Sequence, residues 1–199
     1  MEHLISLITS FGYFGYIILF IIIFLESFPP TFFLPGDSLL FTTGLLASQG
    51  YFNLALLIST FFIAGTLGYI FSHIMGEKLR NIILHSNDRY WFKKKHLDYT
   101  HQFYNKYGAK TIIIGRFVPV VRSFGPILAG VVDMEYKKFF YYTLIGGILW
   151  SCGMTLAGFY LGRIIPNVYL YFTPIILVII FASLLPSITE YVHLGRKNK

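Results

Sequence analysis

The chain has 199 residues, of which 55% are hydrophobic and only 13% are charged, and its mean hydropathy is +0.64. Soluble domains average about 25% charged residues, so this composition excludes a soluble domain and indicates an integral membrane protein. The formal net charge of +7 does not indicate nucleic-acid binding, because the basic residues lie where a membrane protein places them. The length allows one membrane domain, residues 1–199, without a separate soluble domain.

Apolar stretches follow one another along the chain. The first, 12–27, is short but nearly all apolar. Three others, 53–76, 139–162 and 167–190, have the ~20 residues that a ~30 Å hydrocarbon core demands. Two further stretches are apolar but broken, and a straight spanning helix does not tolerate that many breaks. They are 28–46, with Pro29, Pro30, Pro35 and Gly36, and 111–132, with Pro119, Gly125 and Pro126.

The basic residues restrict the topology. Thirteen of the 16 Lys and Arg residues lie in 77–110, in 133–138 and in the C-terminal tail. The positive-inside rule places all three segments in the cytoplasm. We therefore expect a multi-pass membrane protein with both termini in the cytoplasm.

Counting crossings then predicts that the two broken stretches are re-entrant. If 12–27 leaves the cytoplasm and 53–76 returns, 28–46 must begin and end outside. Because the segments on either side of 111–132 are both cytoplasmic, that stretch must dip in from the opposite side. Arms of ~9–11 residues reach ~14–16 Å, which is roughly the bilayer midplane.

The expected fold is all-α, with an inverted repeat that holds two opposed re-entrant helical hairpins and spanning helices, as in secondary transporters. The first repeat is 12–76, the second is 111–162, and 167–190 is the last span. The alternative is two kinked spanning helices, which would put one basic loop on the wrong side.

The linker 77–110 alternates aromatic residues and leucines with lysines. This pattern fits a cytoplasmic amphipathic helix that binds anionic lipid headgroups, and it fits a soluble helical linker equally well. His96 and His101 are five residues apart and do not share a helix face, so we assign no metal site.

The hairpin regions carry opposite charges. The first, "ESFPPTFFLPGDS", holds Glu26 and Asp37, and the second, "GRFVPVVRSFGP", holds Arg116 and Arg122. An isolated charge at the bilayer centre costs ~2.5–3.5 kcal/mol, so these groups should face each other or a wet cavity. One interpretation is two structural ion pairs. The other is a site for an anionic group, because arginine forks suit phosphate and broken helices offer free N–H groups.

Three motifs resemble one family. "GRFVPVVRSFGPILAG" is followed by a basic link and Gly-x-x-x-Trp, "FLPGDSLLFTTG" follows Glu26, and "GYIFSHIMG" ends the first repeat. From about residue 12 to 163 the chain is similar to the DedA family of bacterial membrane proteins, also described by the SNARE-associated or VTT domain. One departure is Ala64-Gly65 before Tyr69, where many members carry Gly-Asp.

The resemblance implies a transporter that moves a lipid carrier, most notably undecaprenyl phosphate, a polyprenyl phosphate, across the cytoplasmic membrane. It implies Glu26, Asp37, Arg116 and Arg122 as functional residues, with the two acids as proton-coupling candidates. The rest of the predicted substrate site consists of the motif residues Pro35, Gly36, Pro119, Ser123 and Pro126. The expected partner is a membrane lipid, and no cofactor is expected. The sequence leaves open whether the protein forms a homo-oligomer.

Other functions stay open at this point. A related possibility is a translocase or scramblase of phosphatidylethanolamine or another phospholipid, and a different class is a proton-coupled transporter of a small solute. An enzyme such as a lipid phosphatase needs a nucleophile and a proton donor. Neither hairpin contains a histidine, and Ser38 and Ser123 have no evident base, so we expect no enzyme.

Overall fold

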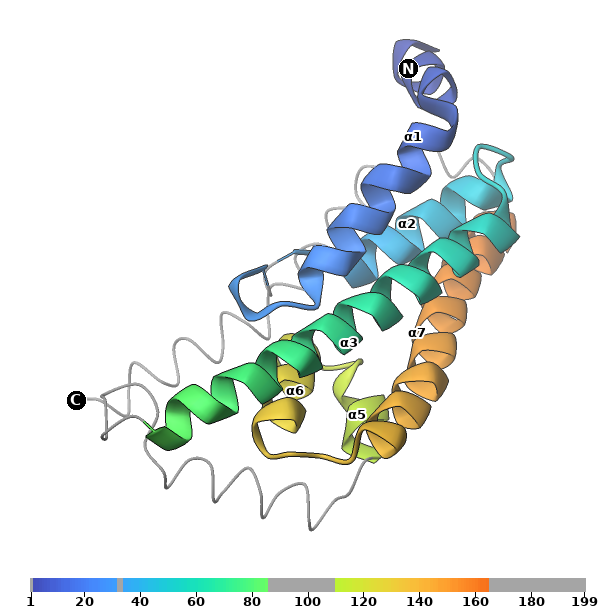
Figure 1. The fold of residues 1–199 in the computed structure, drawn as a ribbon. Coiled ribbons are helices and arrows are strands. Elements are labelled where there is room, and N and C mark those ends of the chain that lie inside the picture. Colours follow the sequence, from blue (N-terminus) through green and yellow to red (C-terminus); the bar gives the residue numbers. More distant parts are fainter. Residues whose placement is uncertain (1, 32–33, 86–109, 165–199) are drawn as a thin grey trace, which may run out of the picture. The chain divides into compact units, whose positions relative to one another are not determined.

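The structure is a computed structural model, and its described residues are 2–31, 34–85 and 110–164 (Figure 1). They form α-helices and one 3₁₀ turn, and no strand occurs among them, which confirms the all-α prediction. The elements are α1 (Glu2–Glu26), η1 (Pro29–Thr31), α2 (Gly36–Ser48), α3 (Leu54–His85), α5 (Lys110–Gly115), α6 (Pro119–Val131) and α7 (Tyr136–Ile164).

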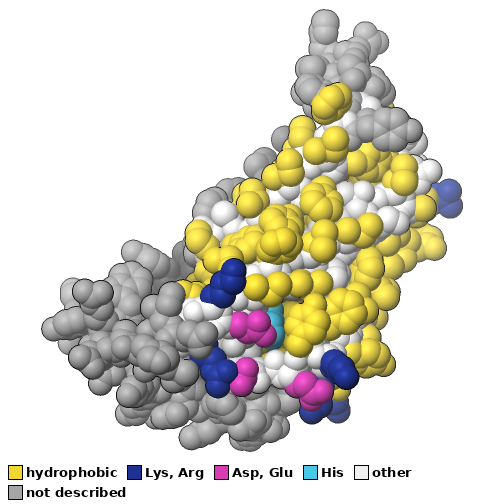
Figure 2. All heavy atoms as spheres, viewed as in Figure 1, with side chains coloured by type: hydrophobic (Ala, Val, Ile, Leu, Met, Phe, Trp, Pro, Cys, Tyr) yellow, Lys and Arg dark blue, Asp and Glu magenta, His cyan; other side chains and the backbone are white. Residues whose placement is uncertain are grey.

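Two helices have the length and composition of membrane spans. Over 18 consecutive residues the mean hydropathy reaches 2.0 within Leu54–Arg80 of α3 and 1.5 within Tyr136–Ile164 of α7. At ~1.5 Å rise per residue, each runs about 40 Å and exceeds the ~30 Å core. They coincide with the predicted stretches 53–76 and 139–162, whereas 167–190 lies outside the described residues. Figure 2 shows apolar side chains over the face of α3, with charged side chains gathered where that helix ends.

The shorter apolar helices differ in detail from the expected hairpins. α1 is kinked at Gly12, whose φ of 38° suits glycine, so its apolar part is the shorter helix Phe14–Glu26. The described residues between α1 and α2 form only the turn η1, so 28–46 contributes one α-helix instead of two helical arms.

In 111–132, only one of the two expected breaks is present. Residues 116–118 separate α5 from α6, and Pro119 begins α6, where its missing N–H removes no helical bond. Pro126 lies inside α6 and does not end it. The ring removes only the bond to the Arg122 carbonyl, a loss that helices in membranes tolerate when other groups satisfy the backbone.

The first residues of the predicted linker are helical. α3 continues to His85, so it includes residues 77–85. The remainder of the linker, 86–109, lies outside the described residues.

The chain forms two compact units. Among the described residues, unit 1 contains 2–23, 34–64 and 151–164, and unit 2 contains 24–31, 65–85 and 110–150. The long helices α1, α3 and α7 therefore each contribute one part to unit 1 and another to unit 2.

In unit 1, α2 packs against the C-terminal part of α7 through glycines. A Cβ on Gly44 would lie 2.1 Å from the Thr155 carbonyl oxygen, and a Cβ on Gly158 would lie 2.0 Å from the Phe41 carbonyl oxygen. These distances leave no space for a side chain. The two backbones approach as closely as small residues permit, as is common between helices in membranes.

We expect Gly158→Ala to lower the free energy of unfolding by about 1–3 kcal/mol, because the added methyl group forces α2 and α7 apart. Gly153→Ala on the same helix is the matched control, since a Cβ at that position would have nothing within 4 Å. Thermal unfolding of the two detergent-solubilised variants measures the difference. Equal stability of the two would contradict the close contact.

Unit 2 repeats this kind of contact between α3 and α6. A Cβ on Gly76 would lie 2.0 Å from the Ile127 carbonyl oxygen, and a Cβ on Gly130 would lie 2.1 Å from the His73 carbonyl oxygen. An apolar core from α3, α5, the end of α6 and α7 lies beside it. Its buried residues are Tyr69, Ile112, Ala129, Val132 and Phe139. This packing holds the charged side chains of the unit in place.

Candidate functional site

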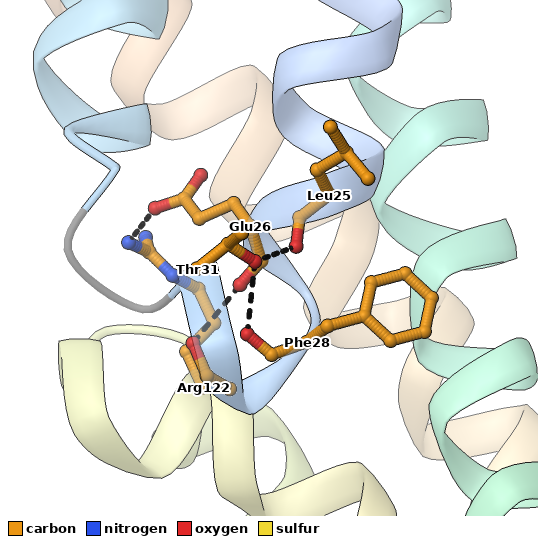
Figure 3. A network of polar contacts seen from close by, with 6 residues as sticks. Leu25, Glu26, Phe28, Thr31 and Arg122 are labelled. Carbon is orange, nitrogen blue, oxygen red and sulfur yellow. Dashed lines mark hydrogen bonds and ion pairs between the residues drawn. The ribbon is translucent and has the colours of Figure 1, made fainter.

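A buried ion pair joins the end of α1 to α6 in unit 2. Arg122 donates a hydrogen bond from Nη2 to Oε1 of Glu26, the last residue of α1 (Figure 3). The side chains are only 5% and 2% exposed, so the pair is shielded from water. Charge-assisted bonds of this kind are about twice as strong as neutral ones.

Two hydroxyl groups fix the backbone around Glu26. Ser123 donates from Oγ to the Glu26 carbonyl oxygen at 2.9 Å, and Ser72 of α3 donates to the Ser27 carbonyl oxygen at 2.7 Å. The last carbonyls of a helix lack helical partners, so these bonds satisfy groups that would otherwise be buried without one. These hydrogen bonds therefore fix the backbone that carries the Glu26 side chain.

An aromatic ring from α7 completes the surroundings of Arg122. The guanidinium carbon lies 5.2 Å from the ring centroid of Trp150, which is buried. This geometry permits a cation–π interaction, which is stronger where water is excluded.

Arg116 has a different environment. It is 1% exposed, and its Nη2 donates to the carbonyl oxygens of Gly65 in α3 and Thr143 in α7, each at 3.4 Å. Its guanidinium carbon lies 3.8 Å from the Tyr69 ring centroid. A Cβ on Gly146 would lie 3.1 Å from the Ile113 Cα and 3.2 Å from the Arg116 Cδ, so α7 passes close to the arginine at this glycine. Among the residues that the structure describes, no carboxylate forms an ion pair with Arg116.

The predicted site residues are therefore divided between the units. Glu26, Arg122 and Ser123 come together in unit 2, which also holds Arg116, Pro119 and the buried Pro126. Asp37 lies in the first turn of α2, one residue after Gly36 and two after the N-cap Pro35, and these three belong to unit 1. An acidic residue at a helix N-terminus is favoured by the helix dipole.

Sequence reasoning missed the groups that surround the arginines. Tyr69 and Trp150 lie inside recognised motifs, but many other aromatic residues occupy the same apolar stretches. A buried guanidinium requires aromatic faces or acceptors nearby, which is a signal that some such partner exists. The sequence contains no feature that selects these two rings or the carbonyls of Gly65 and Thr143.

An apolar cavity of about 640 Å³ lies in the same unit. Its walls come from 25–31, from Met75 and Leu79 of α3, and from one face of α6. The hydroxyl of Thr31 is the polar side-chain group in this lining, and it donates to the carbonyl oxygens of Phe28, at 3.0 Å, and of Leu25 (Figure 3). The lining thus presents hydrocarbon to any occupant.

Comparisons with known proteins agree on one family. The VTT domain matches residues 34–160. Protein DedA of Escherichia coli (strain K12) is 41% identical over 198 residues, which cover 96% of this chain and 88% of that protein.

Two more distant relatives are named as membrane proteins. An uncharacterized membrane protein of Mycobacterium tuberculosis (strain H37Rv) is 37% identical over 94% of this chain and 85% of its own length. The inner membrane protein YqjA of Escherichia coli (strain K12) is 34% identical over 74% of this chain and 68% of its own length. No solved structure matches the chain significantly.

Proposed function

Because the chain belongs to the DedA family of membrane proteins with a VTT domain, we propose that it is a transporter of a lipid phosphate carrier. The proposed substrate is a polyprenyl phosphate such as undecaprenyl phosphate, and the proposed path crosses the cytoplasmic membrane. The observation that carries this proposal is the buried ion pair between Glu26 and Arg122.

The pair supports an exchange of anions at Arg122. A buried ion pair is weak evidence for a purely stabilising role, because apolar residues of similar volume often serve stability equally well. A phosphate group presents oxygen acceptors that match the guanidinium fork, so it can replace the Glu26 carboxylate as the partner of Arg122. Arg116, whose Nη2 donates to two backbone carbonyls, is proposed to hold α3 and α7 together.

The exchange would couple transport to protons. Once phosphate pairs with Arg122, the buried Glu26 carboxylate no longer has a positively charged partner. An uncompensated buried charge is strongly unfavourable. Uptake of one proton by Glu26 removes that charge. Asp37, in unit 1, stays a second proton-coupling candidate.

The apolar cavity supports a lipid over a small solute. It is lined by Leu25 and Phe28, which lie on either side of Glu26 in the chain, and by Phe124, two residues after Arg122. A hydrophilic solute gains nothing from such a surface, whereas burying a hydrocarbon chain stabilises by roughly 25 cal/mol per Å². We propose that the occupant is the hydrocarbon chain of the transported lipid, whose phosphate reaches Arg122.

Helix lengths support the proposed re-entrant arrangement. α2 and α6 have 13 residues each and are ~20 Å long, which is too short for the ~30 Å core. In a Cys152-free protein, we expect cysteine at position 50 to react with an impermeant reagent added outside cells, and cysteine at position 95 not to react. The reverse labelling would exclude both the topology and the inverted repeat.

The transport test uses proteoliposomes that contain undecaprenyl phosphate. An impermeant phosphatase reaches only outer-leaflet lipid, so an active protein should let it dephosphorylate the inner-leaflet lipid as well. Glu26→Gln/Arg122→Gln should abolish this access, whereas Gly153→Ala should retain it. If the protein moves phosphatidylethanolamine instead, its substrate is a phospholipid. If it releases a phosphate ester that was trapped inside the liposomes, its substrate is a small solute. No movement of any of the three would overturn the proposal.

A further inference from the structure

Two buried arginines of unit 2 share one carboxylate. Glu26 forms an ion pair with Arg122, whereas no carboxylate pairs with Arg116 in the part of the chain that the structure describes. The three residues are each at most 4% exposed. With the carboxylate ionised, they together leave one positive charge in a place that is shielded from water. A buried charge without a counter-charge is unfavourable, so the presence of the second arginine requires a reason beyond the ion pair.

The neighbours of Arg116 satisfy its guanidinium only in part. Its two hydrogen bonds to backbone carbonyls are long, at 3.4 Å each, and both come from Nη2. Within the described residues, Nε has no hydrogen-bond partner. The Tyr69 ring from α3 lies against the guanidinium, but the attraction of a neutral ring does not cancel a full charge. Arg116 therefore keeps a positive charge that acts on other groups nearby.

The charge of Arg116 is close enough to Arg122 for the two to interact. The two guanidinium groups repel one another. Their spacing is visible along α7, where a Cβ on Gly146 would lie 3.4 Å from the Arg116 Nε. Trp150, whose ring faces Arg122, follows about one helical turn later, or ~6 Å along the axis. An anion bound to Arg122 would therefore lie roughly 8–10 Å from the charge of Arg116.

The charge balance after anion exchange depends on the charge of the ligand. In the proposed exchange, Glu26 becomes neutral when phosphate replaces it, so the two arginines then carry two uncompensated positive charges. A phosphate monoester carries nearly two negative charges at neutral pH, because its second pKa is about 6. A phosphodiester, as in a phospholipid headgroup, has only one negative charge on its phosphate. The monoester therefore neutralises both arginines, whereas the diester leaves one of them uncompensated.

We propose that Arg116 makes the site selective for a doubly charged phosphate monoester over a singly charged phosphodiester, an inference that rests on the proposed function. Arg116 acts on the ligand through its charge and not through a hydrogen bond, so its bonds to α3 and α7 stay in place. With an effective dielectric constant of ~20, two unit charges roughly 8–10 Å apart change a binding constant roughly 15- to 35-fold. Without Arg116, the second charge of the ligand loses this attraction.

Two ligands with the same hydrocarbon chain test this selection. Undecaprenyl phosphate can carry two negative charges, whereas its methyl ester carries one. At about pH 8, we expect the wild-type protein in nanodiscs to bind the monoester more than about 10-fold more tightly. Arg116→Gln should remove most of this preference, whereas Arg116→Lys should keep it, because the positive charge remains. Each ratio is measured on one protein sample, so an unfolded fraction cancels.

Arg80→Gln is the matched control for the loss of a positive charge. Arg80 belongs to the same unit, but its side chain is 38% exposed and lies 2.7 Å from Asp133. Water and salt screen a charge at such a position, so this variant should have the wild-type affinity ratio.

The pH dependence of the wild-type ratio is a second test that needs no variant. The ratio should rise between about pH 5 and 7, because only the monoester loses a second proton in this range. Titration of Glu26, by contrast, contributes to the binding of both ligands. A ratio that stays near one at every pH would overturn the inference.

The variants give further outcomes that decide the matter. An unchanged ratio in Arg116→Gln would overturn the inference. A ratio in Arg116→Lys as low as in Arg116→Gln would also overturn it, because the fork and not the charge would then be required. If the selection is found but proteoliposomes show no lipid movement, the proposed function fails while the charge-selective site stands. Binding of neither ligand would overturn both proposals.

Discussion

Arg122→Gln should destabilise the protein by about 3–5 kcal/mol, because it leaves the Glu26 carboxylate buried without the guanidinium that neutralises it. Both side chains are almost completely shielded, so water cannot replace the lost partner as it would on a surface. Thermal unfolding in detergent at neutral pH, compared with the wild type, measures the loss. A variant as stable as the wild type would show that the pair has no energetic role.

Two double variants identify the partner of Arg122. Glu26→Gln/Arg122→Gln removes both charges and should recover most of the lost stability, while lipid movement stays absent. Asp37→Asn/Arg122→Gln also restores the net charge balance but keeps the Glu26 carboxylate, so it separates the effect of net charge from that of the bond between Arg122 and Glu26. If Glu26→Gln/Arg122→Gln moves lipid, the charges of Glu26 and Arg122 have a structural role only.

The two arginines should respond in opposite ways to replacement by lysine. Arg122→Lys keeps the charge beside Glu26 but loses the planar fork, so it should reduce lipid-phosphate affinity roughly 10- to 150-fold with little loss of stability. Arg116→Lys shortens the side chain that bonds to the Gly65 and Thr143 carbonyls and removes the flat guanidinium over the Tyr69 ring, so it should lower stability by about 1.5–3 kcal/mol. Its folded fraction should bind the lipid normally.

Binding of undecaprenyl phosphate to purified protein, alongside thermal unfolding of the same samples, separates these effects. Normal affinity in Arg122→Lys would show that this residue is not a phosphate fork. Reduced affinity in folded Arg116→Lys would assign both arginines to the phosphate, which is the arrangement that the sequence alone suggested.

Local composition was sufficient to identify the helices that act as candidate spans. The apolar stretches 53–76 and 139–162 coincide with α3 and α7, because a run of ~20 apolar residues satisfies its backbone most simply as a helix. Pro119 likewise marked a break in the apolar stretch 111–132, and the break lies directly before it, since α6 begins at Pro119. The same reasoning was wrong at Pro126, because the helix continues through a single missing bond.

The sequence by itself determined which charges lie in apolar surroundings, and only the tertiary structure decided how they pair. Arg122 and Glu26 are 96 residues apart in the chain. Their pairing depends on which helix faces meet, and in unit 2 the glycine contact of Gly76 and Gly130 sets how α3 and α6 approach. The burial of His73 has the same cause. Its position in the sequence gives a titratable group, but the packing of α7 against α3 removes that group from water.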